Sequence, residues 1–144
     1  MKNIVYVSQA ERPFAARDLA NLLETSRAKN AGYGVSGLLI YRFNHEYNRG
    51  NFVQAIEGPE AAIDDLWQKI STDNRHHTIV VVQEAAIEAR MFDGWSMGFK
   101  NVDAADLAGF EGFSDLGSDR FWKEISPVSA AGAIELLRNF YDGS

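Results

Sequence analysis

The sequence predicts an α+β fold in which a mixed β-sheet carries two helices on one face and is followed by a C-terminal helical extension. Segments with strand and helix periodicity alternate along the chain in the order βαββαββ. Right-handed crossovers bring both helices of such a chain to the same face of the sheet. The 144 residues are enough for one such core, because a domain of that size buries roughly two-thirds of its unfolded surface.

The first strand and the first helix lie at the start of the chain. Residues 4–8 form a short β-branched run that predicts a strand, and Pro13 precedes a helix expected over residues 14–30. Gly32 and Gly34 end this helix. One stripe of this helix has helical spacing and consists of Leu19, Leu22, Leu23 and Ser26.

A hairpin and a second helix follow. Residues 35–41 and 51–56 predict two paired strands, which are joined by a polar connection over residues 42–50. Pro59 then stands at the first position of a helix, where its missing N–H costs nothing. The apolar stripe of this helix consists of Ile63, Leu66, Trp67 and Ile70.

Two more strands complete the sheet. Residues 78–82 predict a buried strand because they are almost uniformly apolar. Residues 95–99 alternate with period two and predict a further strand. The sequence therefore predicts a first domain over residues 1–102.

Residues 103–144 are expected to form a helical extension that packs on the sheet or at a dimer interface. Residues 103–119 are acidic and rich in glycine, so we expect them to be solvated. Ser126 and Pro127 are typical of the start of a helix, which we expect to reach Phe140. Its apolar stripe consists of Ala133, Ile134, Leu137 and Phe140.

Composition and charge exclude several classes of protein. Lys and Arg total 14 against 20 Asp and Glu, and the net charge of −6 would repel a nucleic-acid backbone. No apolar run approaches the roughly 20 residues of a membrane span, and the N-terminus lacks a signal-peptide pattern, so we expect a cytoplasmic protein. Cysteine is absent and histidine occurs only at positions 45, 76 and 77, so no metal site is expected.

The predicted central strands carry polar side chains on one face. In a ferredoxin-like sandwich, strands 4–8 and 51–56 are expected to be adjacent and parallel at the sheet centre. Side-chain alternation makes one face aliphatic and places Tyr6, Ser8 and Gln54 on the other. Buried polar groups are costly unless they form hydrogen bonds, so backbone, water or a ligand must satisfy them.

Two helical positions add polar groups to the same face. Asn30 lies almost on the meridian of the buried Leu19 and Leu23, and Asp73 continues the stripe that contains Ile70. A tyrosine hydroxyl, two amides and a carboxylate around an apolar slot would suit a flat heterocycle with carbonyl and N–H edges.

These residues resemble a known family, the BLUF domains, which are flavin-binding sensors of blue light with a ferredoxin-like βαββαββ core. The resemblance covers about the first 100 residues of the chain. The matching segments, in order, are VYVS at 5–8, SRAKN at 26–30, VSGLLIY at 35–41, FVQAIEG at 52–58, DNRHH at 73–77 and RMFDGWSM at 90–97.

The resemblance implies roles for individual residues. Tyr6 would be the photo-redox partner of the flavin, Gln54 the switch between them, and Asn30 the contact to the flavin C4 carbonyl edge. Leu22 and Ile70 would lie on the two sides of the ring, Lys69 and Asp73 at the isoalloxazine or ribityl end, and Arg75 and His76 near the outer end. Ser8 is also expected among the cofactor-binding residues.

The resemblance also implies a photochemical mechanism without net turnover, so the protein is not expected to be an enzyme. Electron and proton transfer from Tyr6 through Gln54 recombines and leaves Gln54 rotated or tautomerised, with a red-shifted flavin absorption. Trp95 and Met97 would relay this change to the final strand. Because they lie two residues apart, we expect both on one face of that strand.

Two features depart from the family pattern. The connection Arg42–Arg49 is longer than the family's usual turn, which predicts an extended loop. A one-residue slip of register there would turn Gln54 to the other face. Lys69 stands where the family often has arginine, which keeps the charge but loses the planar fork of hydrogen-bond donors.

The resemblance favours FAD as the cofactor, with FMN or riboflavin as alternatives. Since no catalytic domain is seen in the sequence, we expect a light signal to reach a separate effector protein in trans or to act through a homo-oligomer such as a homodimer. No nucleic acid, membrane or metal partner is expected.

Two other classes of function stay open at this level. A small ferredoxin-like enzyme, such as a phosphoryl hydrolase or a cofactor-free oxygenase, could use Arg12, Asn30 and His76. The glycine-rich phosphate loop that would favour a hydrolase does not follow the first strand. A pure interaction domain could use the aliphatic sheet face and the C-terminal stripe for dimerisation.

Overall fold

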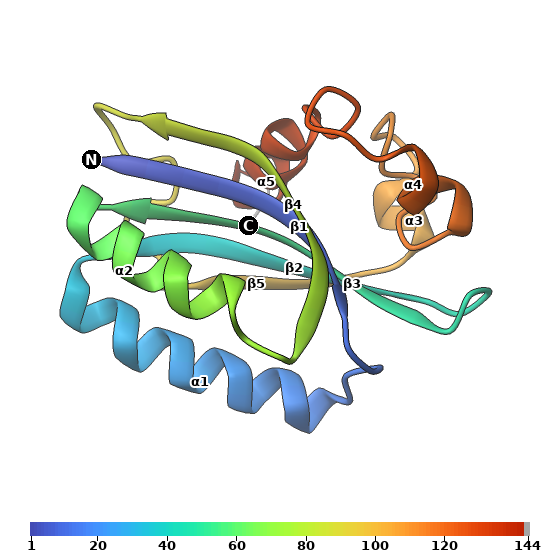
Figure 1. Ribbon diagram of the computed structural model, residues 1–144, viewed down its shortest axis with the longest axis horizontal. Helices are drawn as coiled ribbons and strands as arrows, with labels where there is room; N and C mark the ends of the chain where they lie inside the picture. Colours follow the sequence, from blue (N-terminus) through green and yellow to red (C-terminus); the bar gives the residue numbers. More distant parts are fainter. Residues whose placement is uncertain (143–144) are drawn as a thin grey trace.

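The computed structural model describes residues 1–142 and contains one five-stranded sheet. The strands lie in the order β4-β1-β3-β2-β5, and Figure 1 shows helices on both sides of them. Their bounds are Lys2–Ala10 for β1, Ser36–Asn44 for β2, Arg49–Gly58 for β3, His76–Ala86 for β4 and Gly98–Val102 for β5.

Two longer helices cover one face of the sheet and three C-terminal helices lie on the other. Helices α1 (Ala16–Tyr33) and α2 (Glu60–Ser71) run side by side on the first face (Figure 1). On the far face lie α3 (Ala104–Leu107), α4 (Asp119–Glu124) and α5 (Ala133–Asp142). The predicted α+β class and the order βαββαββ are confirmed.

The face assignments of the central strands are correct. Ile4 on β1 and Ile56 on β3 pack with α1 and α2, whereas Val5 and Val53 pack with the C-terminal helices. The prediction that β1 and β3 are parallel is wrong, because they pair antiparallel throughout. A crossover through α1 makes β1 and β2 point the same way, and the hairpin then reverses β3 between them.

The predicted long loop in the hairpin is also wrong. Strands β2 and β3 continue their pairing to Asn44 and Arg49, so only residues 45–48 form the turn, with Asn48 at a φ of 51°. The additional residues of this connection therefore lengthen β2 and β3, and they do not form a long loop. Register is kept, and Gln54 faces α1 and α2.

The helix ends and the fourth strand differ from the sequence prediction. Helix α1 runs to Tyr33 and contains Gly32, while Gly34 caps it with a φ of 68°. Strand β4 is longer than residues 78–82 and only partly buried, because it is the edge strand and pairs with β1 alone. A uniformly apolar run does not distinguish such an edge strand from a central one.

The extension is more ordered than its composition predicts. Residues 103–119 are not simply solvated, since Leu107, Phe113 and Leu116 are fully buried against the sheet. The terminal helix begins at Ala133 rather than near Ser126, where serine side chains bond to the local backbone and form a turn. The boundary placed after residue 102 stays a prediction.

Candidate functional site

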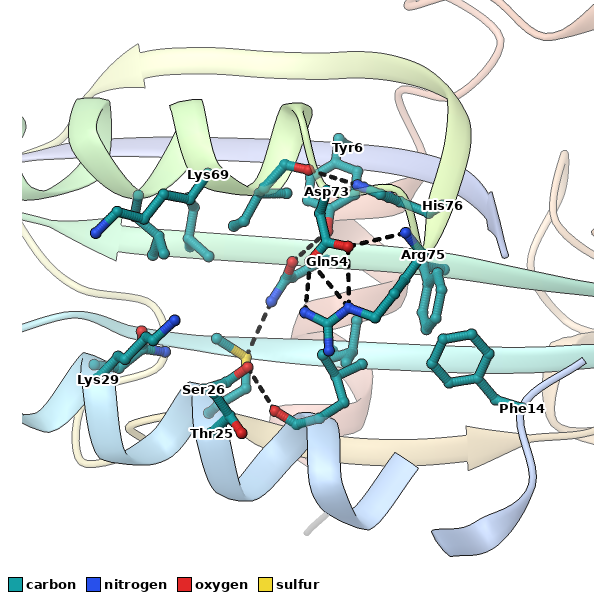
Figure 2. A pocket seen from close by; sticks show the side chains of 18 residues that line it. Tyr6, Phe14, Thr25, Ser26, Lys29, Gln54, Lys69, Asp73, Arg75 and His76 are labelled. Atoms are coloured by element: carbon teal, nitrogen blue, oxygen red, sulfur yellow. Dashed lines mark hydrogen bonds and ion pairs between the residues drawn. The ribbon is translucent and has the colours of Figure 1, made fainter. Parts of the chain in front are cut away.

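A cavity of about 120 Å³ lies between α1, α2 and the sheet. Figure 2 shows its lining side chains converging from both helices and from the central strands. Of the ten side chains expected at the cofactor, nine line it: Tyr6, Leu22, Asn30, Gln54, Lys69, Ile70, Asp73, Arg75 and His76. The structure therefore brings together residues from four separate segments of the chain.

Tyr6 and Gln54 form the centre of the cavity floor. They are directly opposite each other on the paired strands β1 and β3, and the Tyr6 hydroxyl donates a hydrogen bond to Oε1 of Gln54. The Nε2 of Gln54 in turn donates to Sδ of Met97 at 3.4 Å. A continuous chain of polar contacts thus joins Tyr6 to Met97 through one amide.

Burial keeps the Tyr6 phenol neutral. Loss of solvation raises the pKa of Tyr6 far above its ordinary value, and the nearby Asp73 carboxylate adds to the increase. The ring lies 5.2 Å from that of Trp67 and 5.9 Å from that of His76, measured between centroids. Tyr6 is therefore a proton donor to Gln54 in this arrangement, not a phenolate.

Asn30 points inward as expected and is 2% exposed. Its Nδ2 donates to the carbonyl of Ser96 at 2.8 Å, and Nε of Arg27 donates to the carbonyl of Met97 at 2.9 Å. Helix α1 therefore holds the segment before β5 by two consecutive carbonyls. The amide of Asn30 lies at the cavity while it also fixes this segment.

Asp73 and Arg75 form an ion pair at the cavity. Helix α2 ends at Ser71, so Asp73 lies beyond the last helical turn and yet reaches the cavity. Both carboxylate oxygens accept hydrogen bonds from the Arg75 guanidinium, at 2.5 to 3.0 Å, and Figure 2 shows this pair next to Gln54. Hydrogen bonding from Arg75 lowers the pKa of Asp73.

Ser8 is the expected cofactor residue that does not line the cavity. It is fully buried, and its Oγ lies 2.7 Å from Nδ1 of His76, whose Nε2 lies 2.6 Å from the carbonyl of Ile70. The polar group of Ser8 is thus satisfied by His76, which stands between it and the cavity. Side-chain alternation predicted the correct face for Ser8, but it did not predict that His76 would lie between Ser8 and the cavity.

Trp95 and Met97 do not share a strand face. Strand β5 begins at Gly98, and the chain bends at Ser96 and Met97. Met97 packs with the core beside α1 and α2, whereas Trp95 packs with the far-face core against Tyr141, at 4.7 Å between ring centroids. Period-two alternation does not hold where the backbone bends before it joins the sheet.

Sequence reasoning missed several lining residues. Among them, Lys29 lies on α1 at the same end of the cavity as Lys69 of α2, as Figure 2 shows. The others are Phe14, Thr25, Ser26, Leu39, Phe52, Ile56 and Leu66. Helical spacing from Leu22 would have found Thr25 and Ser26, and strand alternation from Gln54 would have found Phe52 and Ile56.

Comparison with known proteins identifies the family. A family model described as BLUF, sensors of blue-light using FAD, matches residues 1–98. The chain belongs to the BLUF family. A photoactivated adenylate cyclase subunit beta of Euglena longa is 35% identical over 98 residues, which are 67% of this chain and 11% of that protein.

Two solved structures, one of them of a BLUF protein, are similar to this chain. The dark-state structure of BlrB is 28% identical, with a TM-score of 0.66, and the match covers 93% of this chain and 96% of that one. The structure of Klebsiella pneumoniae BlrP1 with FMN and cyclic diGMP is also 28% identical, with a TM-score of 0.61, and covers 92% of this chain and 34% of that one.

The chain is therefore a domain of the family of flavin-based blue-light sensors. The chain spans about a tenth of the length of the curated Euglena relatives, so their cyclase activity is a property of much longer proteins. The small-enzyme hypothesis is not favoured, since Arg12 lies outside this cavity and pairs with Asp18 on the surface. Within residues 1–142, no helix is both long and apolar enough to cross a bilayer.

Proposed function

We propose that this BLUF protein binds FAD in the cavity between α1 and α2 and responds to blue light through Tyr6 and Gln54. The observation that carries the proposal is the unbroken contact from the Tyr6 hydroxyl through the Gln54 amide to Met97. An amide has a donor end and an acceptor end, so its rotation or tautomerisation exchanges the hydrogen bonds that its neighbours receive. This exchange gives two stable arrangements, as a switch requires.

The lining residues fit a flat aromatic ring with polar edges. Leu22 of α1 and Ile70 of α2 supply apolar contacts from the two helices, while Gln54 and Asn30 supply amides. The cavity of about 120 Å³ is smaller than the roughly 300 Å³ of typical ligand sites. We infer that the side chains of Asp73 and Arg75 move when the ring enters.

Bound flavin would supply absorption of blue light and an acceptor for one electron. Tyr6 would donate that electron, and its hydroxyl proton would pass to the Gln54 oxygen that already accepts its hydrogen bond. Return of electron and proton restores Tyr6. Gln54 is left in its alternative arrangement, and the surrounding hydrogen bonds of Met97 must adjust to it.

The phosphate end of the cofactor would lie near Lys29 and Lys69. These two cations come from opposite helices at one end of the cavity, which favours a phosphorylated flavin over riboflavin. FMN is the alternative to FAD, and the BlrP1 structure is a complex with FMN. We further propose that the signal reaches a separate effector protein in trans, with the chain acting as a homo-oligomer.

The visible absorption spectrum of the purified protein tests the proposal. We expect a yellow protein whose flavin band shifts reversibly to the red under blue light and recovers in darkness. Asn30→Ala should weaken flavin retention or change the band position, because it removes an amide from the cavity. A protein that stays colourless after incubation with FAD and with FMN would overturn the proposal.

A further inference from the structure

Glu57 is a buried carboxylate on the same strand as Gln54. It is 2% exposed and lies three residues further along β3. Alternation along the strand places it on the face opposite to Gln54. No ion pair involves Glu57 within residues 1–142, so other donors must stabilise the buried charge.

Those donors come mainly from the segment that joins β4 to β5. The backbone N–H of Met91 donates to Oε1 of Glu57 at 2.8 Å, and the N–H of Phe92 donates to Oε2 at 3.0 Å. Ser36 donates its hydroxyl to Oε2 at 2.7 Å. Arg90 reaches the carboxylate indirectly, because it donates to the Ser36 hydroxyl at 2.8 Å.

The same segment is held again a few residues later, beside the cavity. Carbonyls of three consecutive residues accept hydrogen bonds: Trp95 from the N–H of Gly37, Ser96 from Asn30 and Met97 from Arg27. The segment is therefore fixed at its start by Glu57 and at its end by α1 and β2. Met97, in the second group, is the residue that contacts Gln54.

Between these two fixed points the segment contacts the C-terminal helix. The ring of Trp95 packs edge-on against Tyr141 of α5, and the Tyr141 hydroxyl donates to the carbonyl of Asp93 at 3.0 Å. The ring of Phe92 also packs edge-on against Tyr141, at 5.4 Å between centroids. One aromatic side chain of α5 thus contacts both ends of the stretch from Phe92 to Trp95.

We propose that Glu57 is a positioning residue that clamps the backbone at Met91 and Phe92, so that a displacement of Met97 is passed to Tyr141. Hydrogen bonds to an ionised carboxylate are about twice as strong as neutral ones, and two such bonds hold the backbone at Met91 and Phe92. A shift that starts at Gln54 and Met97 must then be taken up between Phe92 and Trp95. This inference rests on the proposed light response of Gln54.

Two variants separate the clamp from a general loss of stability. Glu57→Gln keeps the side-chain shape but replaces one acceptor oxygen by an NH₂ group. Because an NH₂ group does not accept hydrogen bonds, the glutamine cannot bond both the Met91 and the Phe92 N–H groups in the way that the carboxylate does. Ser36→Ala is the matched control, because it removes a donor from the same carboxylate and leaves Met91 and Phe92 bonded to it. Both are studied as the full chain with bound flavin, in darkness and under blue light.

The measurements are the flavin spectrum and residue-resolved amide hydrogen exchange by NMR. For Glu57→Gln we expect amides 91 and 92 to exchange about tenfold faster in darkness. The light-driven change of exchange near Tyr141 should fall below half of that in the unmodified protein, while the flavin red shift is retained. Ser36→Ala should match the unmodified protein within about twofold in the dark exchange of amides 91 and 92, in the light-driven change near Tyr141 and in the size of the red shift.

Two results would overturn the clamp. One is unchanged exchange at Met91 and Phe92 in Glu57→Gln, and the other is faster exchange there together with a full light-driven change at Tyr141. If Glu57→Gln does not fold, Glu57→Asp gives the same test, because its shorter side chain keeps the charge and cannot reach both amides. Absence of a red shift in the unmodified protein would refute the proposed function instead, and the dark exchange would still test the clamp.

Discussion

The two faces of the sheet bury their polar groups in different ways. On the α1 and α2 face, Gln54 bonds a tyrosine hydroxyl and a thioether sulfur next to a cavity. On the far face, Asn51 of the same strand is fully buried, and its amide bonds two backbone carbonyls and the Trp122 indole. The first amide has one partner, the Tyr6 hydroxyl, that can either donate or accept, whereas every partner of the second amide has a fixed role.

This difference shows how one strand can carry a switch and an anchor three residues apart. A hydroxyl can donate or accept, so the contact between Tyr6 and Gln54 permits two arrangements. A backbone carbonyl only accepts and an indole N–H only donates, so Asn51 has a single satisfied orientation. Light-driven change is therefore expected to start on the face with the cavity, while the buried core of the far face supplies stability.

The largest effect is expected at Gln54. Gln54→Leu removes both ends of the switchable amide and should abolish the light-induced red shift while flavin is still bound. Tyr6→Phe should do the same, because it removes the hydroxyl that donates to Gln54. Light-minus-dark visible spectra check both variants. A normal photocycle in Gln54→Leu would mean that the two amides do not differ in the proposed way.

The far-face core should give the largest change in stability. Leu136 of α5 is fully buried against the sheet, and Leu136→Ala should lower the free energy of unfolding by about 2–5 kcal/mol. Urea unfolding measures this change. The red shift should keep its size in the folded fraction, so a lost red shift with little loss of stability would contradict the division between the faces.

A smaller loss of stability is expected from the anchoring amide. Asn51→Ala leaves the Trp122 N–H without its acceptor and should cost about 1–3 kcal/mol. Ser71→Ala is a suitable control, since the Ser71 hydroxyl makes only an exposed bond to the carbonyl of Gln68. Urea unfolding should give Asn51→Ala a clearly lower midpoint than the unmodified protein and Ser71→Ala. Equal midpoints in the three proteins would show that Asn51 is not an anchor.

The smallest effect concerns the ion pair at the cavity. Because Arg75 lowers the pKa of Asp73, the pair stabilises the folded protein at pH values above the ordinary aspartate value of about 4. The contribution is lost as the pH falls through the lowered pKa. Asp73→Asn should therefore reduce stability by about 1 kcal/mol or less at neutral pH, and the difference should vanish in acid. If the unfolding midpoints of the unmodified protein and of Asp73→Asn differed by the same amount at pH 7 and at pH 2, this prediction would be contradicted.

The central strands illustrate how much of the site the sequence predicts. Alternation along β1 and β3 placed Tyr6 and Gln54 together, and helical spacing turned Asn30 inward. Both patterns are local and repeat with the geometry of one element. The resemblance to BLUF domains supplied the roles of these residues, which the patterns do not contain.

Other features depend on contacts that no local pattern encodes. The bend at Ser96 sends Trp95 and Met97 to opposite faces because α1 holds two carbonyls there. The acidic stretch after β5 is folded because its few apolar residues find the far face of the sheet. The overall composition of a segment does not show which of its residues are buried. Here the burial of Leu107 and Phe113 stabilises a folded segment despite the charged residues around them.

The sequence alone thus determined the order of elements, the two faces of each central strand and the inward positions of Tyr6, Gln54 and Asn30. These depend on periodicity, which the backbone geometry of helices and strands dictates. Only the tertiary structure decided the antiparallel pairing of β1 with β3, the separation of Trp95 from Met97, and the burial of Glu57 under two backbone amides. Each of these arises from hydrogen bonds or packing between residues far apart in the chain, and their partners are chosen only when the whole fold forms.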